Sequence, residues 1–311
     1  MPIWSPKTVT GTAELVHPYA SLAYAHALSH AGRPVAVPEW GVPILARSIP
    51  RNFDPALGHG EDAMGLYPLT ALATTADLSG GLERLRGLGL VSVVLVPDPL
   101  AAPLRERLLE AFDFVRPFKA HLTIDPARGR YSPSRHHAER IRRGHRRCQI
   151  DVGSLPLWLE DWKRLYRGLV TRRSISGAAA FPDASFEVMG KDPALVAFAA
   201  SVGDRIVGMT LWFAFDGVIY NHLTAVDADG YAHGASFALY DTAIKHFEGQ
   251  GVVNLGGGAG IGSGEGGLFA FKSGFANGEV MTSLCGAVLD PARYAALSAG
   301  VETEFFPAYR A

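Results

Sequence analysis

Apolar and polar positions alternate along the chain with two different periods, which predicts a mixed α/β fold. Residues 155–172 are expected to be helical, because their large apolar side chains recur on one face. Residues 195–201, 206–215 and 218–225 are strand-like, and the dipeptides at 203–204 and 216–217 separate them as hairpin turns. The other expected elements are helices over 18–30, 78–88, 100–112 and 235–247, a short helix around 271–272, and strands over 42–49, 64–69, 91–96, 114–124, 252–255 and 280–289.

The order of these elements is similar in the two halves of the chain. Residues 87–91 and 249–253 each end a helix with glycine and enter a strand. We therefore expect a tandem duplication of one α/β unit, with a first domain over 1–130, a basic connecting segment over 131–153 and a second domain over 154–311. The two units should pack through residues 133–153, with the active groove between them.

Composition narrows the class of protein. The chain has 311 residues, 48% of them hydrophobic, and a net charge of −1, which is typical of a globular protein with a core in each of two domains. The longest apolar run, at 88–97, is half of what a membrane-spanning helix needs, and the first seven residues do not resemble a signal peptide. We therefore expect no membrane span and a cytoplasmic location. Cys148 and Cys285 lie far apart, which indicates neither a disulfide framework nor a zinc site.

A basic cluster lies between the two halves. Residues 128–147 contain eight arginines, three histidines and a single acid, Glu139. In a chain of nearly zero net charge this cluster is a local positive field, for which phosphates are the natural partners. The candidate phosphate-binding residues are Arg142, Arg143, Arg146 and Arg147. Alternatively, the arginines pair with acids across the interface between the units, or they are solvated.

A glycine-rich loop is the second conspicuous feature. Eight glycines lie between residues 256 and 267, and the aromatic and basic run at 268–275 follows them. Because glycine lets the backbone approach a ligand closely, the loop indicates a binding site, with Gly257 and Gly258 among its lining residues. It lacks the Gly-x-x-x-x-Gly-Lys-Ser/Thr spacing of a nucleotide-binding loop.

The loop, the Phe271–Lys272 pair and the arginine-rich segment 134–144 together resemble the Fem family of aminoacyl-tRNA-dependent ligases, within the GNAT-like acyltransferase superfamily. The resemblance covers most of the chain and is strongest over 133–275. It implies two GNAT-like acyltransferase units in tandem, with the acceptor bound by the first and the donor by the second. It also implies an amide-forming transfer in which Lys272 takes part.

The donor can be compared with that of acyl-CoA enzymes of the superfamily. These hold the pyrophosphate with an Arg/Gln-x-x-Gly-x-Gly/Ala pattern at the start of a helix. Residues 229–236 lack the leading arginine or glutamine of that pattern, which argues against CoA. Aminoacyl-tRNA needs no such cradle, and a carrier-protein thioester is an equally acceptable donor. We expect an activated acyl donor and no tightly bound cofactor or metal.

Amide formation requires stabilisation of an oxyanion and removal of a proton from the amine. Lys272 is the first candidate for oxyanion stabilisation, since one such donor contributes about 2.7–4 kcal/mol; it could instead cap its helix or cover Phe269 and Phe275. His222 could act as the base, or it could be an ordinary core histidine. The other candidates are Tyr220, Asn221 and Phe271 around the transfer site, with Asp62 to orient or deprotonate the amine and Tyr67 to line the acceptor pocket, although 60–69 also reads as a plain loop.

Three functional classes follow. The first is an acyltransferase that moves an aminoacyl group from aminoacyl-tRNA to an amine of a small metabolite or cell-wall precursor. The length of 311 residues, without a coiled-coil insertion, favours the small metabolite. The second is a GNAT-like N-acyltransferase that uses acyl-CoA or a carrier-protein thioester. The third is a non-catalytic module that binds phosphate or nucleic acid. The acceptor, the transferred group and the oligomeric state stay open.

Overall fold

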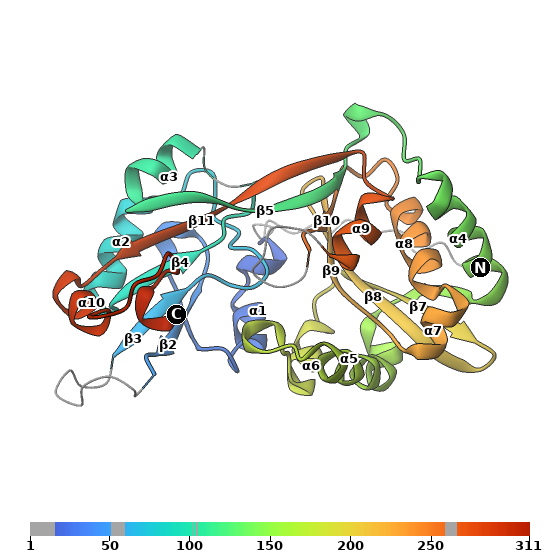
Figure 1. The fold of residues 1–311 in the computed structure, drawn as a ribbon, viewed down its shortest axis with the longest axis horizontal. Helices are drawn as coiled ribbons and strands as arrows, with labels where there is room; N and C mark the ends of the chain where they lie inside the picture. The colour runs from blue at the N-terminus through green and yellow to red at the C-terminus, as the bar shows by residue number, and fades with distance from the viewer. Residues whose placement is uncertain (1–15, 51–59, 102, 104, 259–265) are drawn as a thin grey trace.

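The computed structural model describes residues 16–50, 60–101, 103, 105–258 and 266–311. Most of the glycine-rich loop, residues 259–265, therefore lies outside the described residues. Within them the strands form one mixed sheet in the order β1-β2-β3-β4-β11-β5-β10-β9-β8-β7-β6 (Figure 1). The mixed α/β class predicted from the sequence is confirmed.

The first half of the chain supplies one end of the sheet. Its elements are α1 (Leu22–Ala27), β1 (Arg33–Val35), β2 (Ile44–Ser48), β3 (Glu61–Met64), α2 (Leu78–Gly87), β4 (Ser92–Leu95), α3 (Arg105–Ala111) and β5 (Phe114–Ile124). The prediction of a strand over 64–69 is wrong. Strand β3 ends at Met64, and the chain continues without regular structure into the cis peptide bond between Tyr67 and Pro68.

The second half supplies the other end of the sheet. Its elements are α4 (Arg135–Arg147), β6 (Gln149–Gly153), α5 (Leu159–Arg173), α6 (Asp183–Met189), β7 (Leu195–Val202), β8 (Arg205–Phe215), β9 (Val218–Val226), α7 (Ala228–His233), α8 (Ala235–His246), β10 (Val252–Gly256), α9 (Gly267–Ser273), β11 (Gly278–Val288) and α10 (Pro291–Leu297).

The two halves repeat the same order of elements. Strands and helices β3-α2-β4-α3-β5 correspond to β9-α8-β10-α9-β11, and in each set the first two strands are parallel neighbours. The last strands are exchanged: β5 pairs with β10 of the second half, and β11 pairs with β4 of the first. Since β5 and β11 also pair with each other along the middle of the molecule (Figure 1), the two halves share one continuous sheet.

The basic connecting segment does not lie where the sequence suggested. Helix α4 packs on α8, and β6 is the edge strand beside β7, at the end of the sheet far from the first half (Figure 1). Gly144 permits this contact, because a Cβ atom there would lie 2.6 Å from the carbonyl oxygen of Gly234. The expectation that the units pack through 133–153 is therefore wrong, since β5 and β11 join them instead.

Hydrophobic residues cover both faces of the sheet in the second half. On one face Trp162 and Phe186, from α5 and α6, pack with Phe213. On the other face Tyr240 of α8 packs with Trp212. Because successive residues of β8 point to opposite faces, the neighbours Trp212 and Phe213 are both fully buried.

Candidate functional site

The ladder between β9 and β10 is short, and it ends next to the candidate site. Only residues 252–254 of β10 pair with 218–220 of β9, although β9 continues to Val226 and β10 to Gly256. Beyond the pair Asn254–Tyr220 the facing edges of these two strands therefore do not hydrogen-bond to each other. The carboxyl ends of parallel strands are the usual place for a ligand in α/β sheets.

Lys272 extends from α9 to this end of β10. Its side chain is 7% exposed, and its ammonium donates a hydrogen bond of 3.1 Å to the carbonyl oxygen of Gly257. It therefore does not cap its own helix. Burial, and then the nearby Lys119, lower the pKa of Lys272 to about 8. Among the described residues no carboxylate forms an ion pair with Lys272.

The glycines before the undescribed part of the loop are close to this lysine. A Cβ atom at Gly256 would lie 3.3 Å from the Lys272 Nζ atom, and one at Gly257 would lie 3.1 Å from the carbonyl oxygen of Ala120. Gly256 also has a φ angle of +75°, which favours glycine. Gly258 is partly exposed and follows in an irregular segment.

His121 and Asn254 adjoin the same place and were missed from the sequence. His121 lies on β5 and is 9% exposed, while Asn254 lies on β10 and is 2% exposed. The Asn254 Oδ1 atom accepts a hydrogen bond of 2.8 Å from the Gly256 amide. Burial, and then Lys272, lower the pKa of His121 to about 4. The alternation within 114–124 was visible in the sequence, but the pairing of this strand with β10 was not.

Tyr220 and His222 lie on β9 in a buried cluster that both halves build. The Tyr220 hydroxyl donates a hydrogen bond of 2.5 Å to Asp98, which follows β4 and is completely buried. The Tyr19 hydroxyl lies 3.2 Å from His222 Nδ1. Burial raises the pKa of Asp98 and lowers that of His222 to about 3, so His222 is neutral at neutral pH.

Tyr67 joins this cluster from the first half. Its carbonyl oxygen accepts a hydrogen bond of 2.6 Å from Tyr24, and its ring lies 6.0 Å from that of Phe181. The Phe181 ring lies in turn 5.9 Å from that of His222. The structure thus brings Tyr67, Tyr220 and His222 into one cluster. Sequence reasoning had missed Asp98.

Asn221 and Phe271 lie on the opposite face of the sheet from Tyr220. The Tyr240 hydroxyl donates a hydrogen bond of 2.7 Å to Asn221 Oδ1, and the Tyr240 ring lies 4.9 Å from that of Phe271. These two candidates therefore hold helices α8 and α9 to the sheet. The structure does not bring them to the His222 cluster, because adjacent residues of a strand point to opposite faces.

Asp62 is far from these groups in the sheet. Strands β4, β11 and β5 lie between its strand, β3, and β10. It is completely buried, and it accepts hydrogen bonds from Arg47 Nε at 2.9 Å, from the Tyr309 hydroxyl at 3.2 Å and from Arg310. Because these donors occupy both carboxylate oxygens, the geometry gives Asp62 a structural place and does not support its action on an amine.

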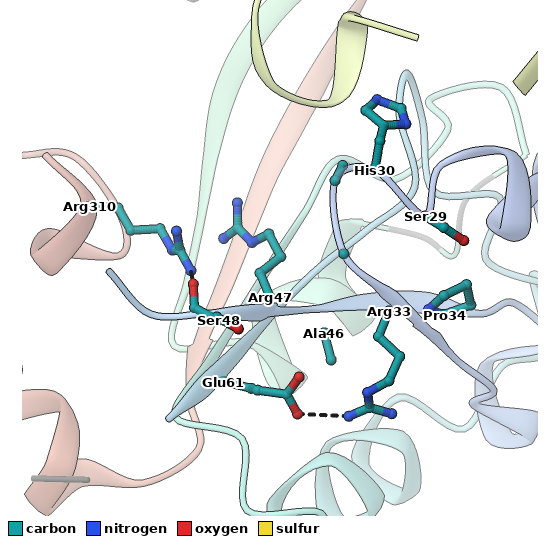
Figure 2. Close-up of a pocket in the computed structure, with 11 residues that line it drawn as sticks. Ser29, His30, Arg33, Pro34, Ala46, Arg47, Ser48, Glu61 and Arg310 are labelled. Carbon is teal, nitrogen blue, oxygen red and sulfur yellow. Dashed lines mark hydrogen bonds and ion pairs between the residues drawn. The ribbon is translucent and has the colours of Figure 1, made fainter. Parts of the chain in front are cut away.

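Beside Asp62 lies a hollow of about 610 Å³, which Figure 2 shows. Arg33, Arg47 and Arg310 line it, and Arg33 forms an ion pair of 2.7 Å with Glu61. The hollow lies at the edge strands of the first half and contains none of the candidate transfer residues.

The four candidate phosphate-binding arginines are exposed on α4. In the described part of the chain none of Arg142, Arg143, Arg146 and Arg147 forms a salt bridge, so pairing with acids across the interface is not what the structure shows. The other end of the same helix contacts α9: His137 Nε2 lies 2.7 Å from the Phe271 carbonyl oxygen, and the Ser134 amide donates to Gly274. The basic helix is therefore attached to the helix that carries Lys272.

Helix α7 and the beginning of α8 form the segment in which acyl-CoA enzymes would hold the pyrophosphate. Residues 228–233 form helix α7, directly before Gly234 and α8. Asp227 and Asp229 lie at the beginning of α7, and both form ion pairs with Arg205. Two carboxylates here, and the close contact of α4 with the first turn of α8, are unfavourable for a pyrophosphate.

No helix among the described residues is long and apolar enough to cross a membrane. Nor do they contain a group of three or more His, Cys, Asp or Glu side chains that could hold a metal ion.

Comparisons with known proteins agree with this architecture. Residues 127–272 match the family model of the acetyltransferase (GNAT) domain. No curated protein matches the chain. Three similar solved structures are the C-terminal domain (DUF2156) of a protein described as a lysylphosphatidylglycerol synthetase from Agrobacterium fabrum (14% identity, TM-score 0.60, 88% of this chain and 89% of that one), L-PGS from Bacillus licheniformis (11%, 0.56, 88% and 94%) and FemX (11%, 0.56, 88% and 92%).

At these identities the solved structures show only that the fold is similar. The family model indicates the class of reaction, which is acyl transfer. The resemblance to Fem-type proteins suggested by the sequence is confirmed at the level of the fold. Residues 127–272 thus form an acyltransferase domain of the GNAT type, and the fold of the chain is similar to those of FemX and L-PGS.

Proposed function

We propose that the protein forms an amide bond by transferring an aminoacyl group from aminoacyl-tRNA to an amine of a small metabolite or cell-wall precursor. The observation that carries this proposal is the buried ammonium of Lys272, which touches Gly257 at the open end of β10 and has no carboxylate partner among the described residues. A cation in this environment is well placed to stabilise negative charge that develops on a substrate.

The reaction needs one bond to form and one to break. The amine nitrogen attacks the ester carbonyl, so that a C–N bond forms and the carbonyl oxygen becomes an oxyanion. Lys272 stabilises this oxyanion, and the bond between the carbonyl carbon and the ribose oxygen then breaks. The amine loses a proton, and the ribose oxygen gains one. Because water is largely excluded around Lys272, its charge acts more strongly than it would in solvent.

The basic helix α4 supports tRNA as the donor. Its four exposed arginines can bind phosphates, and its first turn is attached to α9 through His137 and Ser134. Phosphates bound along α4 would therefore be held by a helix that is attached to α9, which carries Lys272. Each such contact releases counterions, so binding should weaken steeply with salt.

A GNAT-like N-acyltransferase that uses acyl-CoA or a carrier-protein thioester is the second candidate, because residues 127–272 match the GNAT domain. Helix α7 and the acidic pair Asp227 and Asp229 argue against CoA in particular. The thioester of a carrier protein does not depend on that segment.

We assign the acceptor to the junction of the two halves. Tyr67 and Asp98 come from the first half, and Tyr220 and His222 come from the second. These residues lie on the face of the sheet that also carries Asn254, since Asn254 and Tyr220 are paired neighbours.

A survey of donors tests the proposal. The purified protein is incubated with ethanolamine as the amine and with one donor at a time: mixed radiolabelled aminoacyl-tRNA, acetyl-CoA, or an acyl-loaded carrier protein. We expect amide product from aminoacyl-tRNA, and little from the Lys272→Met variant. Product from acetyl-CoA alone would refute tRNA as the donor, and product from the carrier alone would favour the second candidate.

A further inference from the structure

We propose that His121 is a second catalytic residue, which accepts the proton that the attacking amine releases. This inference rests on the proposed amide-forming transfer and adds the base that the reaction needs.

The register of the sheet places His121 on the acceptor face. Asn254 of β10 is paired with Tyr220 on one side and with Thr123 of β5 on the other. Paired residues of neighbouring strands share a face, and so do residues two apart in one strand. Leu122 belongs to the hydrophobic cluster on the other face, which agrees with this alternation. His121 is therefore on the same face as Asn254 and Tyr220.

His121 and Lys272 meet at one residue. A Cβ atom at Gly257 would lie 3.3 Å from the Cδ2 atom of the imidazole, and the carbonyl oxygen of Gly257 accepts the hydrogen bond from Lys272. A carbonyl carbon bound at Gly257 would thus have the ammonium and the imidazole as neighbours. The ammonium can stabilise the oxyanion, and the imidazole can accept the proton of the amine.

The hydrogen-bonding capacity of the imidazole is not used up. Among the described residues neither His121 Nδ1 nor Asn254 Nδ2 has a hydrogen-bond partner, and both atoms are buried. Leaving such groups unpaired costs free energy in a folded protein. A bound substrate that engages them would remove this cost, which is what a site built for a polar ligand provides.

The charges around His121 suit a transient proton carrier. Burial, and then Lys272 and Lys119, oppose protonation of the imidazole, so the ring is neutral at neutral pH. A neutral imidazole can take the proton from the amine nitrogen when the C–N bond forms. The resulting imidazolium is unstable beside Lys272, so it passes the proton to the ribose oxygen when the C–O bond breaks. The proton balance of the reaction then closes without another group.

The test compares His121→Gln and His121→Ala with the parent protein, using mixed aminoacyl-tRNA and ethanolamine. We expect the single-turnover rate to fall by about 10²-fold or more, the lower range for a lost general base, while the Kd for aminoacyl-tRNA stays within threefold. Free imidazole should restore part of the rate in His121→Ala, which a purely structural role would not allow. His246→Gln, at a half-buried histidine on α8, is the control and should keep the parental rate.

The outcomes separate this inference from the proposed function. If His121→Gln keeps a rate within threefold of the parent while Lys272→Met is inactive, the inference is wrong and the proposed function stands. If the rate falls, imidazole does not restore the rate of His121→Ala, and the Kd for aminoacyl-tRNA rises by the same factor as the rate falls, then His121 has only a structural role. If one variant fails to fold, as judged by its melting temperature, the other decides. If the parent itself transfers nothing from tRNA, both proposals fail.

Discussion

Tyr220 donates a hydrogen bond of 2.5 Å to Asp98, a residue 122 positions earlier in the chain. The carboxylate belongs to the first half and the phenol to the second. The same carboxylate also accepts a hydrogen bond of 3.0 Å from the Leu100 amide. The pair therefore satisfies a completely buried carboxyl group and links the two halves at the cluster around Tyr220 and His222.

Removing the phenol hydroxyl should destabilise the protein. In Tyr220→Phe the buried Asp98 loses a donor, and an unsatisfied buried group costs about 1–3 kcal/mol. We expect a lower free energy of unfolding in urea titrations. Adding Asp98→Asn to Tyr220→Phe should cost less than the sum of the two single changes, because both remove one interaction. Additive effects would show that the two residues act independently.

The buried ammonium of Lys272 should destabilise the folded protein. Its pKa of about 8 is below the ordinary 10.5, so between these pH values the unfolded chain binds more protons than the folded one. The free energy of unfolding should therefore rise with pH across this window. Below pH 8 the buried charge costs about 3 kcal/mol at most, and Lys272→Met should recover part of it. A melting temperature at pH 7 that is lower for Lys272→Met than for the parent would contradict this.

The buried histidines should make the protein sensitive to acid. The pKa values of His17 and His121 are about 4, and that of His222 is about 3, all below the ordinary 6.5. The stability that these neutral rings contribute is fully present above pH 6.5. It is lost as the pH falls from there towards 4, because the unfolded chain takes up protons first. Urea titrations from pH 7 to 4 should show this loss, and His222→Gln should make it smaller; an unchanged pH dependence in that variant would count against a buried neutral His222.

The arginines of α4 should control donor binding and not folding. Replacing Arg142, Arg143, Arg146 and Arg147 with alanine should weaken tRNA binding and reduce the slope of log Kd against log salt by up to roughly three. The melting temperature should change little, since the four side chains are exposed. The matched lysine variant keeps the charges, so it should keep most of the affinity. Equal binding by the parent and the alanine variant at low salt would exclude this surface as the donor site.

The sequence predicted most of the local structure because the local signals were strong. The strand predicted over 114–124 is β5. The strand predicted over 206–215, between two hairpin dipeptides, is β8. The glycine loop and the Phe-Lys pair also led to Lys272, which the structure places at the end of β10. These features depend on residues that are close together in the chain.

What the sequence could not give depends on long-range pairing. His121 adjoins Gly257 only because β5 is exchanged onto β10, and Asp98 reaches Tyr220 across the two halves. The sequence suggested that Asp62 orients or deprotonates the amine, but one of its carboxylate oxygens accepts a hydrogen bond from Arg310, which is 248 positions away. Neither the exchange of strands nor this ion pair leaves a mark on local periodicity.

In the proposed function, Lys272 promotes aminoacyl transfer from tRNA to an amine. The most direct test is the single-turnover rate of amide formation from radiolabelled aminoacyl-tRNA and ethanolamine, measured for the parent, Lys272→Met and Lys272→Arg at saturating protein. We predict that the methionine variant binds tRNA normally and reacts about 10²–10³-fold more slowly, and that arginine restores only part of the rate because its planar group places the charge differently. A methionine variant that reacts within a few-fold of the parent would contradict a role of Lys272 in the transfer.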